Sequence, residues 1–229
     1  MQPYLVFTLT ANLAAMGDLA GHERRGSLAW PGRSAILGLL AAALGVERDG
    51  DFATLDALEM AVAVFDDGRP LRDYHTVETV PSAVIRQPNS RPQALAAAPL
   101  KNNTTITLRD YRTDALYGVA VWGGDLEPLK AALTAPRFTL YLGRKSCTLS
   151  APPGANIASA DGPEQALEAL VLPPWRQGAS ARWLMADAEP DDSHVQLRQD
   201  RPLDRTKWHF AQRRVAIRQV DIQPKGRPA

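Results

Sequence analysis

Residues 140–147, Leu-Tyr-Leu-Gly-Arg-Lys-Ser-Cys, place the only cysteine of this 229-residue chain directly after a glycine, two cations and a serine. A phosphate-binding loop of the Walker A type needs an earlier glycine, five positions before the Gly-Lys-Ser/Thr end, and a helix after it. This stretch has only Gly143, and Pro152 and Pro153 soon follow it. The spacing therefore argues against a nucleotide site. Cations beside a thiol favour its reactive thiolate form, but the sequence assigns none of the four histidines to Cys147 as a general base.

Two interpretations of the stretch stay open on local grounds. In the first, Gly143 lets the backbone approach a polyanion, the polar residues after it donate hydrogen bonds to phosphate oxygens, and the tyrosine before it stacks on a base. In the second, the stretch is an ordinary solvated turn and Cys147 is a small buried side chain. The polar and aromatic residues in question are Tyr141, Arg144, Lys145 and Ser146. No cysteine or histidine spacing fits a metal site, so neither metal nor cofactor is expected.

Charge is sorted along the chain although the net charge is only +1. From Arg198 onward there are nine Lys and Arg residues against three Asp, and between Glu78 and Asn103 the only acid is Glu78. A net charge near zero that conceals basic regions leaves nucleic-acid binding open. The start of the chain has no basic segment or cleavage pattern of an export signal, and the longest apolar run, residues 35–45, is too short to span a membrane. We therefore expect a cytoplasmic protein with no membrane contact.

The elements that must position these residues can be predicted from periodicity and turn signals. Apolar and β-branched residues predict a strand over 4–9, a loop carrying Arg24 and Arg25, and a buried helix that begins near 32–34 and ends at Gly45. Two strand-like segments, 69–80 and 102–113, flank about twenty residues rich in Pro, Ala and Ser, which indicates a long projecting hairpin. The remaining expected elements are a short helix over 51–60, strands over 61–68 and 115–124, a helix over 125–136 capped by Asp125 with Pro128 in its first turn, a helix over 162–172, and strands over 181–187, 194–200 and 207–222.

This order of strands and helices is that of an α+β protein with a ferredoxin-like, or split βαβ, domain. Six segments spread over nearly the whole chain add a more specific pattern. They read YLVFTL, RRGSLAWPGRSAILGLLAAALG, LRDYHTV, ITLRDYRTDALYGVAV, PRFTLYLGRKSC and RPLDRTKWHFAQRRV. Each is weak alone, but in this order the set is specific, and it resembles the CasD family of type I-E CRISPR Cascade subunits in the RAMP superfamily.

The resemblance implies a fold and a function. It implies an RRM-like ferredoxin domain over residues 1–150 with a β-hairpin thumb at roughly Leu71 to Arg112, and a small β-rich C-terminal part over 151–229 that completes the fold. It also implies noncatalytic capture of the crRNA 5′ handle, with the thumb crossing the guide near the handle–spacer junction and displacing a nucleotide. The implied partners are crRNA, a Cascade backbone subunit at the thumb, the large PAM-reading subunit and, indirectly, target DNA, in an antiviral complex whose filament this subunit caps.

The same resemblance implies which side chains contact RNA. They are Arg25, Ser27, Arg33, Ser34, His75, Arg109, Tyr141, Arg144, Lys145, Ser146 and Cys147. Structural roles stay open for several: Arg33 and Ser34 could cap their helix, His75 could be an ordinary strand histidine, and Arg109 could form a surface ion pair with Asp110 or Asp114.

Two positions depart from the family pattern. Met16-Gly17 stands where the family often has Trp-Gly, which puts base stacking there in doubt. Pro31-Gly32-Arg33-Ser34 replaces Pro-Thr-Arg/Lys-Ser, which removes one hydroxyl donor but keeps the backbone N–H groups.

An enzymatic alternative follows from type I-C relatives that cleave the repeat RNA. Metal-independent cleavage needs a base for the 2′-hydroxyl and cations for the developing charge, for which His22, His75, Tyr141 and Lys145 are the candidates. No recognisable pair of these residues exists in the sequence, so we expect binding without catalysis. A third possibility is a structural bridge between subunits whose assembly is independent of the handle sequence.

Overall fold

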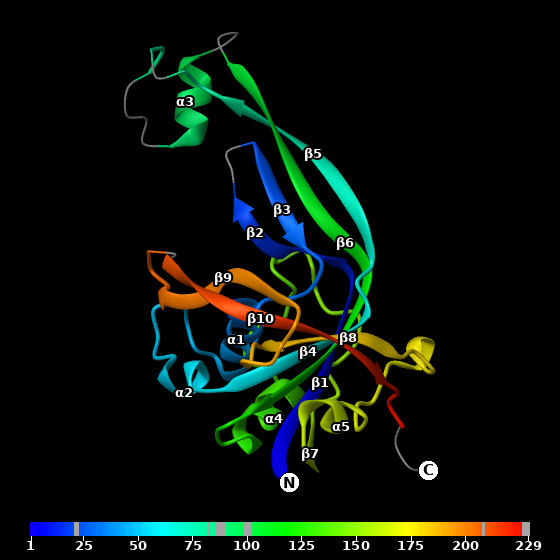
Figure 1. Ribbon diagram of the computed structural model, residues 1–229. Helices are drawn as coiled ribbons and strands as arrows, with labels where there is room; N and C mark the ends of the chain where they lie inside the picture. Colours follow the sequence, from blue (N-terminus) through cyan, green and yellow to red (C-terminus); the bar gives the residue numbers. More distant parts are fainter. Residues whose placement is uncertain (21–22, 82, 86–89, 99–101, 208, 226–229) are drawn as a thin grey trace.

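The computed structural model of the chain describes residues 1–20, 23–81, 83–85, 90–98, 102–207 and 209–225. Within them one large, mostly antiparallel sheet carries few helices (Figure 1). The strands are β1 (Gln2–Ala14), β2 (Met16–Ala20), β3 (Arg24–Leu28), β4 (Glu59–Asp66), β5 (Arg69–Thr79), β6 (Asn103–Trp122), β7 (Asn156–Ala160), β8 (Ala181–Asp187), β9 (Val195–Asp204) and β10 (His209–Ile222). The helices are α1 (Arg33–Leu44), α2 (Ala53–Asp56), α3 (Arg91–Ala97), α4 (Glu127–Thr134), α5 (Pro163–Leu167) and a 3-10 turn at Pro174–Arg176.

The 20-residue strand β6 organises the sheet. Its C-terminal half lies between β1 and β4, with Gly118 opposite Thr8 on one side and Ala63 on the other. β7 joins the free edge of β1, and β8 joins β4 and is followed by β10 and β9. The N-terminal half of β6 leaves this body and pairs with β5 instead.

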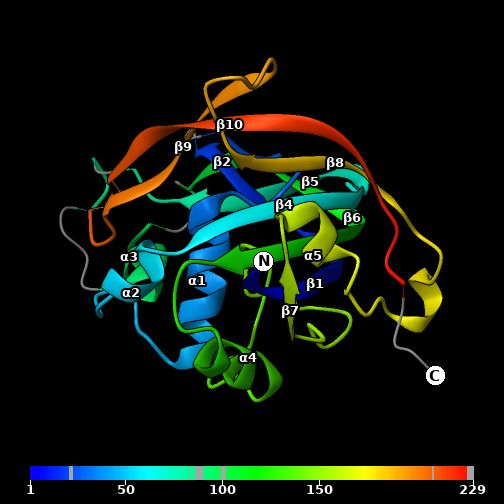
Figure 2. The same ribbon diagram turned by 60° about the horizontal axis from the view of Figure 1, so that its bottom comes forward.

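Two apolar clusters form the core, one on each face of the sheet. Helices α1 and α4 cover one face, where Leu37, Leu40 and Leu133 pack on alternate residues of β1, β4 and β6. Helix α5 covers the other face with Leu167. Helix α1 is apolar on nearly all sides and ends at Gly45, whose φ of 83° is left-handed, as its sequence predicts. Figure 2 shows α1 and α4 together beneath the strands.

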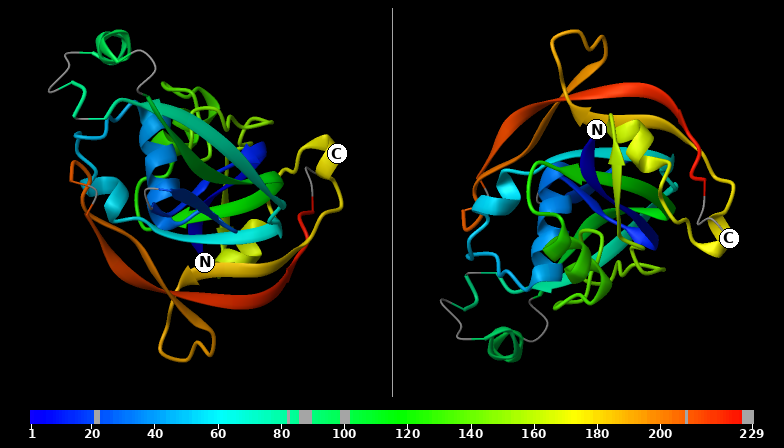
Figure 3. Two further views of the ribbon diagram at one scale, coloured as in Figure 1. Left: turned by 90° about the horizontal axis from the view of Figure 1, so that it is seen from above. Right: turned by 90° about the horizontal axis from the view of Figure 1, so that it is seen from below.

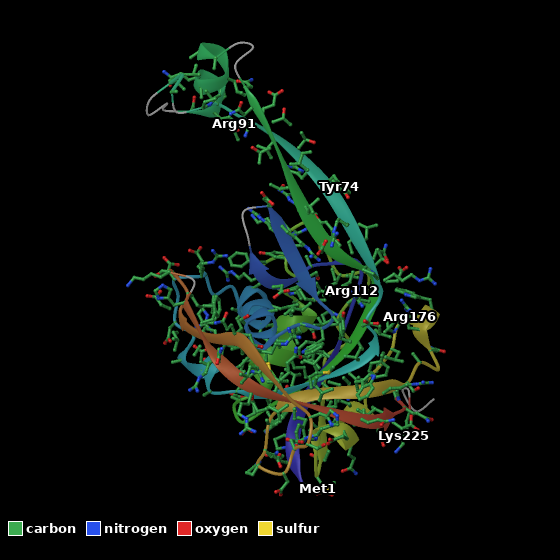
Figure 4. The ribbon with its side chains drawn as sticks, turned by 45° about the horizontal axis from the view of Figure 1, so that its top comes forward. Met1, Tyr74, Arg91, Arg112, Arg176 and Lys225 are labelled. Carbon is green, nitrogen blue, oxygen red and sulfur yellow. The ribbon has the colours of Figure 1, made fainter. Side chains whose placement is uncertain are left out.

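The predicted hairpin is confirmed: β5 and the first half of β6 pair from Arg69↔Thr113 to Thr79↔Asn103 and project from the body, with α3 near their tip (Figure 1). We call this hairpin the thumb. Figure 4 shows Tyr74 on its projecting part and Arg91 at the start of α3. The Pro-, Ala- and Ser-rich insertion between the two strands contains a helix over Arg91–Ala97, which Ser90 caps by accepting a hydrogen bond from the Gln93 N–H (3.4 Å).

Other sequence expectations need correction. The loop expected after the first strand is a hairpin, β2–β3, and β1 itself runs on to Ala14. Helix α2 has only four residues, because Glu59 and Met60 already belong to β4. Strand β7 is an addition to the elements that the sequence predicts. Helix α4 has Leu126 rather than Asp125 at its N-cap, although the Asp125 carboxylate still accepts from the Glu127 N–H (3.4 Å). None of the described helices is long and apolar enough to cross a membrane.

Candidate nucleic-acid interface

One face at the base of the thumb gathers arginines from three parts of the chain. Arg109 and Tyr111 are two residues apart on β6, so their side chains share a face. Strand β3 runs parallel to β6 here and places Arg25 opposite Arg109. On β5, Asp73 is opposite Arg109 and His75 is opposite Thr107, so His75 also belongs to this face.

The 140–147 stretch reaches the same face through a backbone contact. Gly143 has a φ of 86°, and a Cβ built on it would stand 1.7 Å from the Ala15 carbonyl oxygen. The Ala15 N–H donates to Leu142 O (3.0 Å), and within the turn the Leu142 N–H donates to Cys147 O (2.8 Å). The glycine therefore does permit a close backbone approach, but the partner is the end of β1. This contact holds the turn, and with it Arg144, against the body.

Arg144 lies over the ring of Tyr111, with its guanidinium carbon 4.4 Å from the ring centroid. Its Nη1 and the Nε of Arg109 are both buried and have no hydrogen-bond partner in the described structure. An unsatisfied buried donor costs about 1–3 kcal/mol, and more when it is charged. Phosphate oxygens are acceptors that suit guanidinium donors of this kind.

The ion pair that could have occupied Arg109 does not form in the described structure. Asp110 points to the opposite face of the thumb, where its carboxylate accepts from Arg24 Nε and from Arg72 Nε, both at 2.8 Å. These bonds, the one from Arg72 first, hold the pKa of Asp110 below its ordinary value. The hydrogen bonds to Asp110 join β3, β6 and β5, and they leave the Asp110 carboxylate unavailable to Arg109. Lower in the thumb, Arg112 binds Asp67, and in the body Arg176 binds Asp66 at 3.0 Å (Figure 4).

Arg33 has a structural role. Its guanidinium donates to the carbonyl oxygens of Asp56 and Leu58, each at 2.7 Å, and burial lowers its pKa. Its backbone N–H donates to Asp200 Oδ2 (2.7 Å), so a carboxylate from the C-terminal third already occupies this helix N-terminus. Gly32 leaves room for it, since a Cβ there would stand 2.8 Å from Asp200 Oδ2. For Arg33 the structure favours the capping role, and Ser34 lies half-buried beside it.

The remaining residues that were predicted to contact RNA differ in their hydrogen bonds and in their exposure. Ser27 Oγ accepts from the Met16 N–H (3.0 Å) and donates to Leu28 O (3.2 Å), which closes the β2–β3 hairpin. Met16 is buried, so no base can stack on it. Tyr141 forms a β-bridge with Thr148, while Lys145 and Ser146 are exposed in the turn.

Cys147 is 1% exposed, and its Sγ lies 4.0 Å from the Oγ of the adjacent Ser146. A buried thiol with no general base beside it in the described residues does not suit a nucleophile. Of the nuclease candidates, His22 lies outside the described residues. In the described ranges, no three His, Cys, Asp or Glu side chains are grouped to hold a metal ion.

Sequence reasoning missed Tyr111, which supports Arg144, and the apolar side of the thumb. Tyr74 is 69% exposed and Ile106 56%, and both lie on the face opposite Arg109. The i, i+2 spacing of Arg109 and Tyr111 on a predicted strand was the available signal for Tyr111.

Replacing Gly143 with Ala is expected to displace the turn and destabilise the protein. A left-handed Ala costs about 1–2 kcal/mol, and the clash with Ala15 O adds to it. Urea unfolding measures the loss, and the reaction of Cys147 with a thiol reagent, which should speed up, reports the displaced turn. Gly178→Ala is the matched control, because Gly178 has a φ of 81° but open space around its Cβ. Equal losses for the two variants would contradict the contact with Ala15.

With this geometry established, known proteins provide the identification. A family model described as CRISPR-associated protein (Cas_Cas5) matches residues 4–216. A CRISPR-associated protein is thus the class that the chain represents. Within that class it belongs to the Cas5 family.

The relatives agree with the resemblance inferred from the sequence, which is confirmed. The chain is 35% identical over 185 residues to the CRISPR system Cascade subunit CasD of Escherichia coli (strain K12), covering 73% of this chain and 76% of the relative. A solved chain described as a CRISPR RNA-guided surveillance complex superposes with a TM-score of 0.71 at 22% identity, over 96% of this chain and 90% of that one. A crystal structure of a Cas protein superposes with a TM-score of 0.63 at 28% identity, over 97% and 96%.

Proposed function

We propose that this chain is a noncatalytic crRNA-binding subunit of a type I-E Cascade complex and that it holds the 5′ handle of the guide RNA. The observation that carries the proposal is the pair of unsatisfied guanidinium donors on Arg109 and Arg144, beside Arg25 and Tyr111, in a protein of the Cas5 family. The E. coli relative is described as a Cascade subunit, which supports the complex.

The fold proposed for this role is ferredoxin-like. The chain order β1, α1, β4, β6, α4, β7 and the pairing order β7-β1-β6-β4 are those of a βαββαβ unit. The thumb is then an insertion between its second and third strands. We keep the proposed division into an RRM-like part over 1–150 and a small part over 151–229 that completes the fold: the second part supplies β7, the fourth strand of the unit, and adds β8 to the same sheet.

In the proposed mechanism the base of the thumb neutralises handle phosphates. Arg109 and Arg144 donate to phosphate oxygens, Arg25 adds charge, and Lys145 and Ser146 extend the site along the turn. Handle bases are held unpaired, which exposes the edges that distinguish their sequence. The thumb then crosses the guide and contacts a backbone subunit. The large PAM-reading subunit and target DNA complete the proposed partners, and the complex acts in the cytoplasm.

The RNA that copurifies with the chain tests this function. Coexpressed with its own CRISPR repeat RNA and the other Cascade subunits, the chain is expected to retain RNA with one uniform 5′ end that lies in the repeat. RNA with random ends, or no RNA, would contradict the proposal. Incubating the purified chain with unprocessed repeat RNA tests the nuclease alternative: a specific cut that His75→Ala abolishes would replace the noncatalytic assignment.

A further inference from the structure

Most of the basic residues in the C-terminal third are already used inside the protein. Arg213 donates to both oxygens of Asp200 (2.9 and 2.8 Å) and to Asp187 (2.7 Å). Arg205 binds both oxygens of Asp56 (2.8 and 2.6 Å). These arginines tie the β9–β10 hairpin and the turn after β9 to the body, and their charge is neutralised there.

Two further cations are held inside the protein, one by an aromatic ring and one by a carboxylate. The guanidinium of Arg198 stacks on Trp30, with its carbon 3.9 Å from the ring centroid. Arg218 binds both oxygens of Asp192 (2.9 Å each), and this lowers the pKa of Asp192 to about 2. Over its described residues, the basic C-terminal stretch therefore mostly holds the sheet and loops together and does not form a continuous polyanion-binding strip.

The side of this hairpin that faces away from α1 has a different character. Exposure alternates along β9 from Leu197 to Leu203, because the positions between them turn toward the body. Leu197 is 60% exposed and Leu203 69%. Arg201 and Arg214 are exposed beside them and form no ion pair in the described part of the chain. We call this surface the outer hairpin face; it comprises Leu197, Gln199, Arg201, Leu203, Gln212 and Arg214.

The outer hairpin face is on the side of β9 opposite to Arg198, which stacks on Trp30 just after β3, and it lies away from the tip of the thumb. Both views in Figure 3 show β9 and β10, in orange and red, along the outside of the molecule and away from α3. Strand β9 is the last strand in its direction of the sheet. Leu197 and Leu203 are six residues, about 20 Å, apart on this strand, so they are two separate exposed apolar side chains beside the arginines and not one continuous patch.

We propose that the outer hairpin face binds a protein: an acidic surface with apolar side chains on a neighbouring subunit of the complex. The inference rests on the proposed function. The apolar groups of this face are leucines, which bury well against a protein, whereas the bases of single-stranded RNA are held by aromatic rings. The two arginines carry the charge that an acidic partner complements, and arginine is enriched in protein interfaces. The test must distinguish such a protein partner from RNA bound at the same face.

The test compares Cascade assembled with the wild-type chain and with a variant carrying Leu197→Asp, Leu203→Asp, Arg201→Glu and Arg214→Glu. Each complex is purified through a tag on this chain, and native mass spectrometry gives the subunits and the guide RNA that it retains. The variant is expected to lose at least about tenfold in retention of one protein subunit, because four favourable contacts become repulsive or desolvated. The isolated variant should bind handle RNA with unchanged affinity. A second variant with only Arg201→Glu and Arg214→Glu keeps the leucines and should show a smaller loss of the same subunit.

The matched control replaces an exposed aromatic and a cation elsewhere on the surface, with Phe138→Asp and Lys130→Glu, and should retain all subunits. Unchanged subunit composition in the fourfold variant would overturn the inference. A loss of RNA affinity in the isolated variant, with subunits retained, would overturn it in favour of an RNA surface. A wild-type chain that retains neither RNA nor subunits would overturn the proposed function, and the inference with it.

Discussion

Replacing Arg109 and Arg144 together with Ala is expected to weaken binding of the guide RNA 5′ handle by at least about 100-fold. Hydrogen bonds to charged groups contribute about 1.5–3 kcal/mol each, and 1.4 kcal/mol is a factor of ten in affinity. The effects of neighbouring substitutions do not simply add, so the expected value is the lower end of the sum. The salt dependence should change as well: removing two phosphate interactions from a single strand lowers the slope of log K against log salt by about 1.4. Titrations of labelled handle RNA at several KCl concentrations measure both quantities.

Two sets of variants test whether the loss of RNA affinity comes from these two side chains or from the lower net charge of the protein. Lys130→Ala with Arg182→Ala removes the same charge from surface positions elsewhere and should leave the affinity within about twofold. Arg109→Lys with Arg144→Lys keeps the charge but loses the planar fork and the stacking on Tyr111, so it should fall between the wild type and the alanine variant. If the alanine variant matched the surface control in affinity and slope, these arginines would not hold the handle.

Local patterns predicted the parts of the fold that local forces determine. The apolar run before Gly45 predicted a buried helix, and alternating residues around a Pro- and Ser-rich insertion predicted the thumb. The β2–β3 hairpin was missed because its five-residue strands contain glycines and charged residues with little apolar alternation. Its stability comes from pairing with β6, a partner about eighty residues away that no local window contains.

For the site, sequence could name residue types but not their neighbours. It selected Arg109 and Arg144, and the structure brings both to the face of Tyr111. It could not show that Gly143 packs on Ala15, since that contact joins parts of the chain far apart in sequence. Nor could it show that the Arg33 N–H donates to Asp200 and that its guanidinium donates to the carbonyl oxygens of Asp56 and Leu58. Nothing near Arg33 in the chain predicts these partners.

Asp200 is the position where one substitution should cost most in stability. The residue is 7% exposed, and its carboxylate caps α1 through the Arg33 N–H and accepts two hydrogen bonds from Arg213. Removing one partner of a buried ion pair costs about 3–5 kcal/mol, because the other charge stays buried. Arg213 keeps Asp187, which places Asp200→Ala near the lower end, at about 3 kcal/mol. For a chain of this size that corresponds to a melting temperature lower by about 6–12 °C.

The cause of that loss can be isolated by removing both charges. Asp200→Leu with Arg213→Met leaves no buried ion unpaired, so it should lose less free energy of unfolding than Asp200→Ala alone. Asp221→Ala on the same hairpin is the control, since Asp221 is exposed and bonds Gln223 at the surface, and it should change stability by less than about 0.5 kcal/mol. Equal losses for the single and the double variant would mean that the uncapped α1, rather than the stranded Arg213 charge, dominates. Because Asp200 joins β9 to the start of α1, its loss in Asp200→Ala should also loosen the outer hairpin face, so subunit retention should fall together with stability.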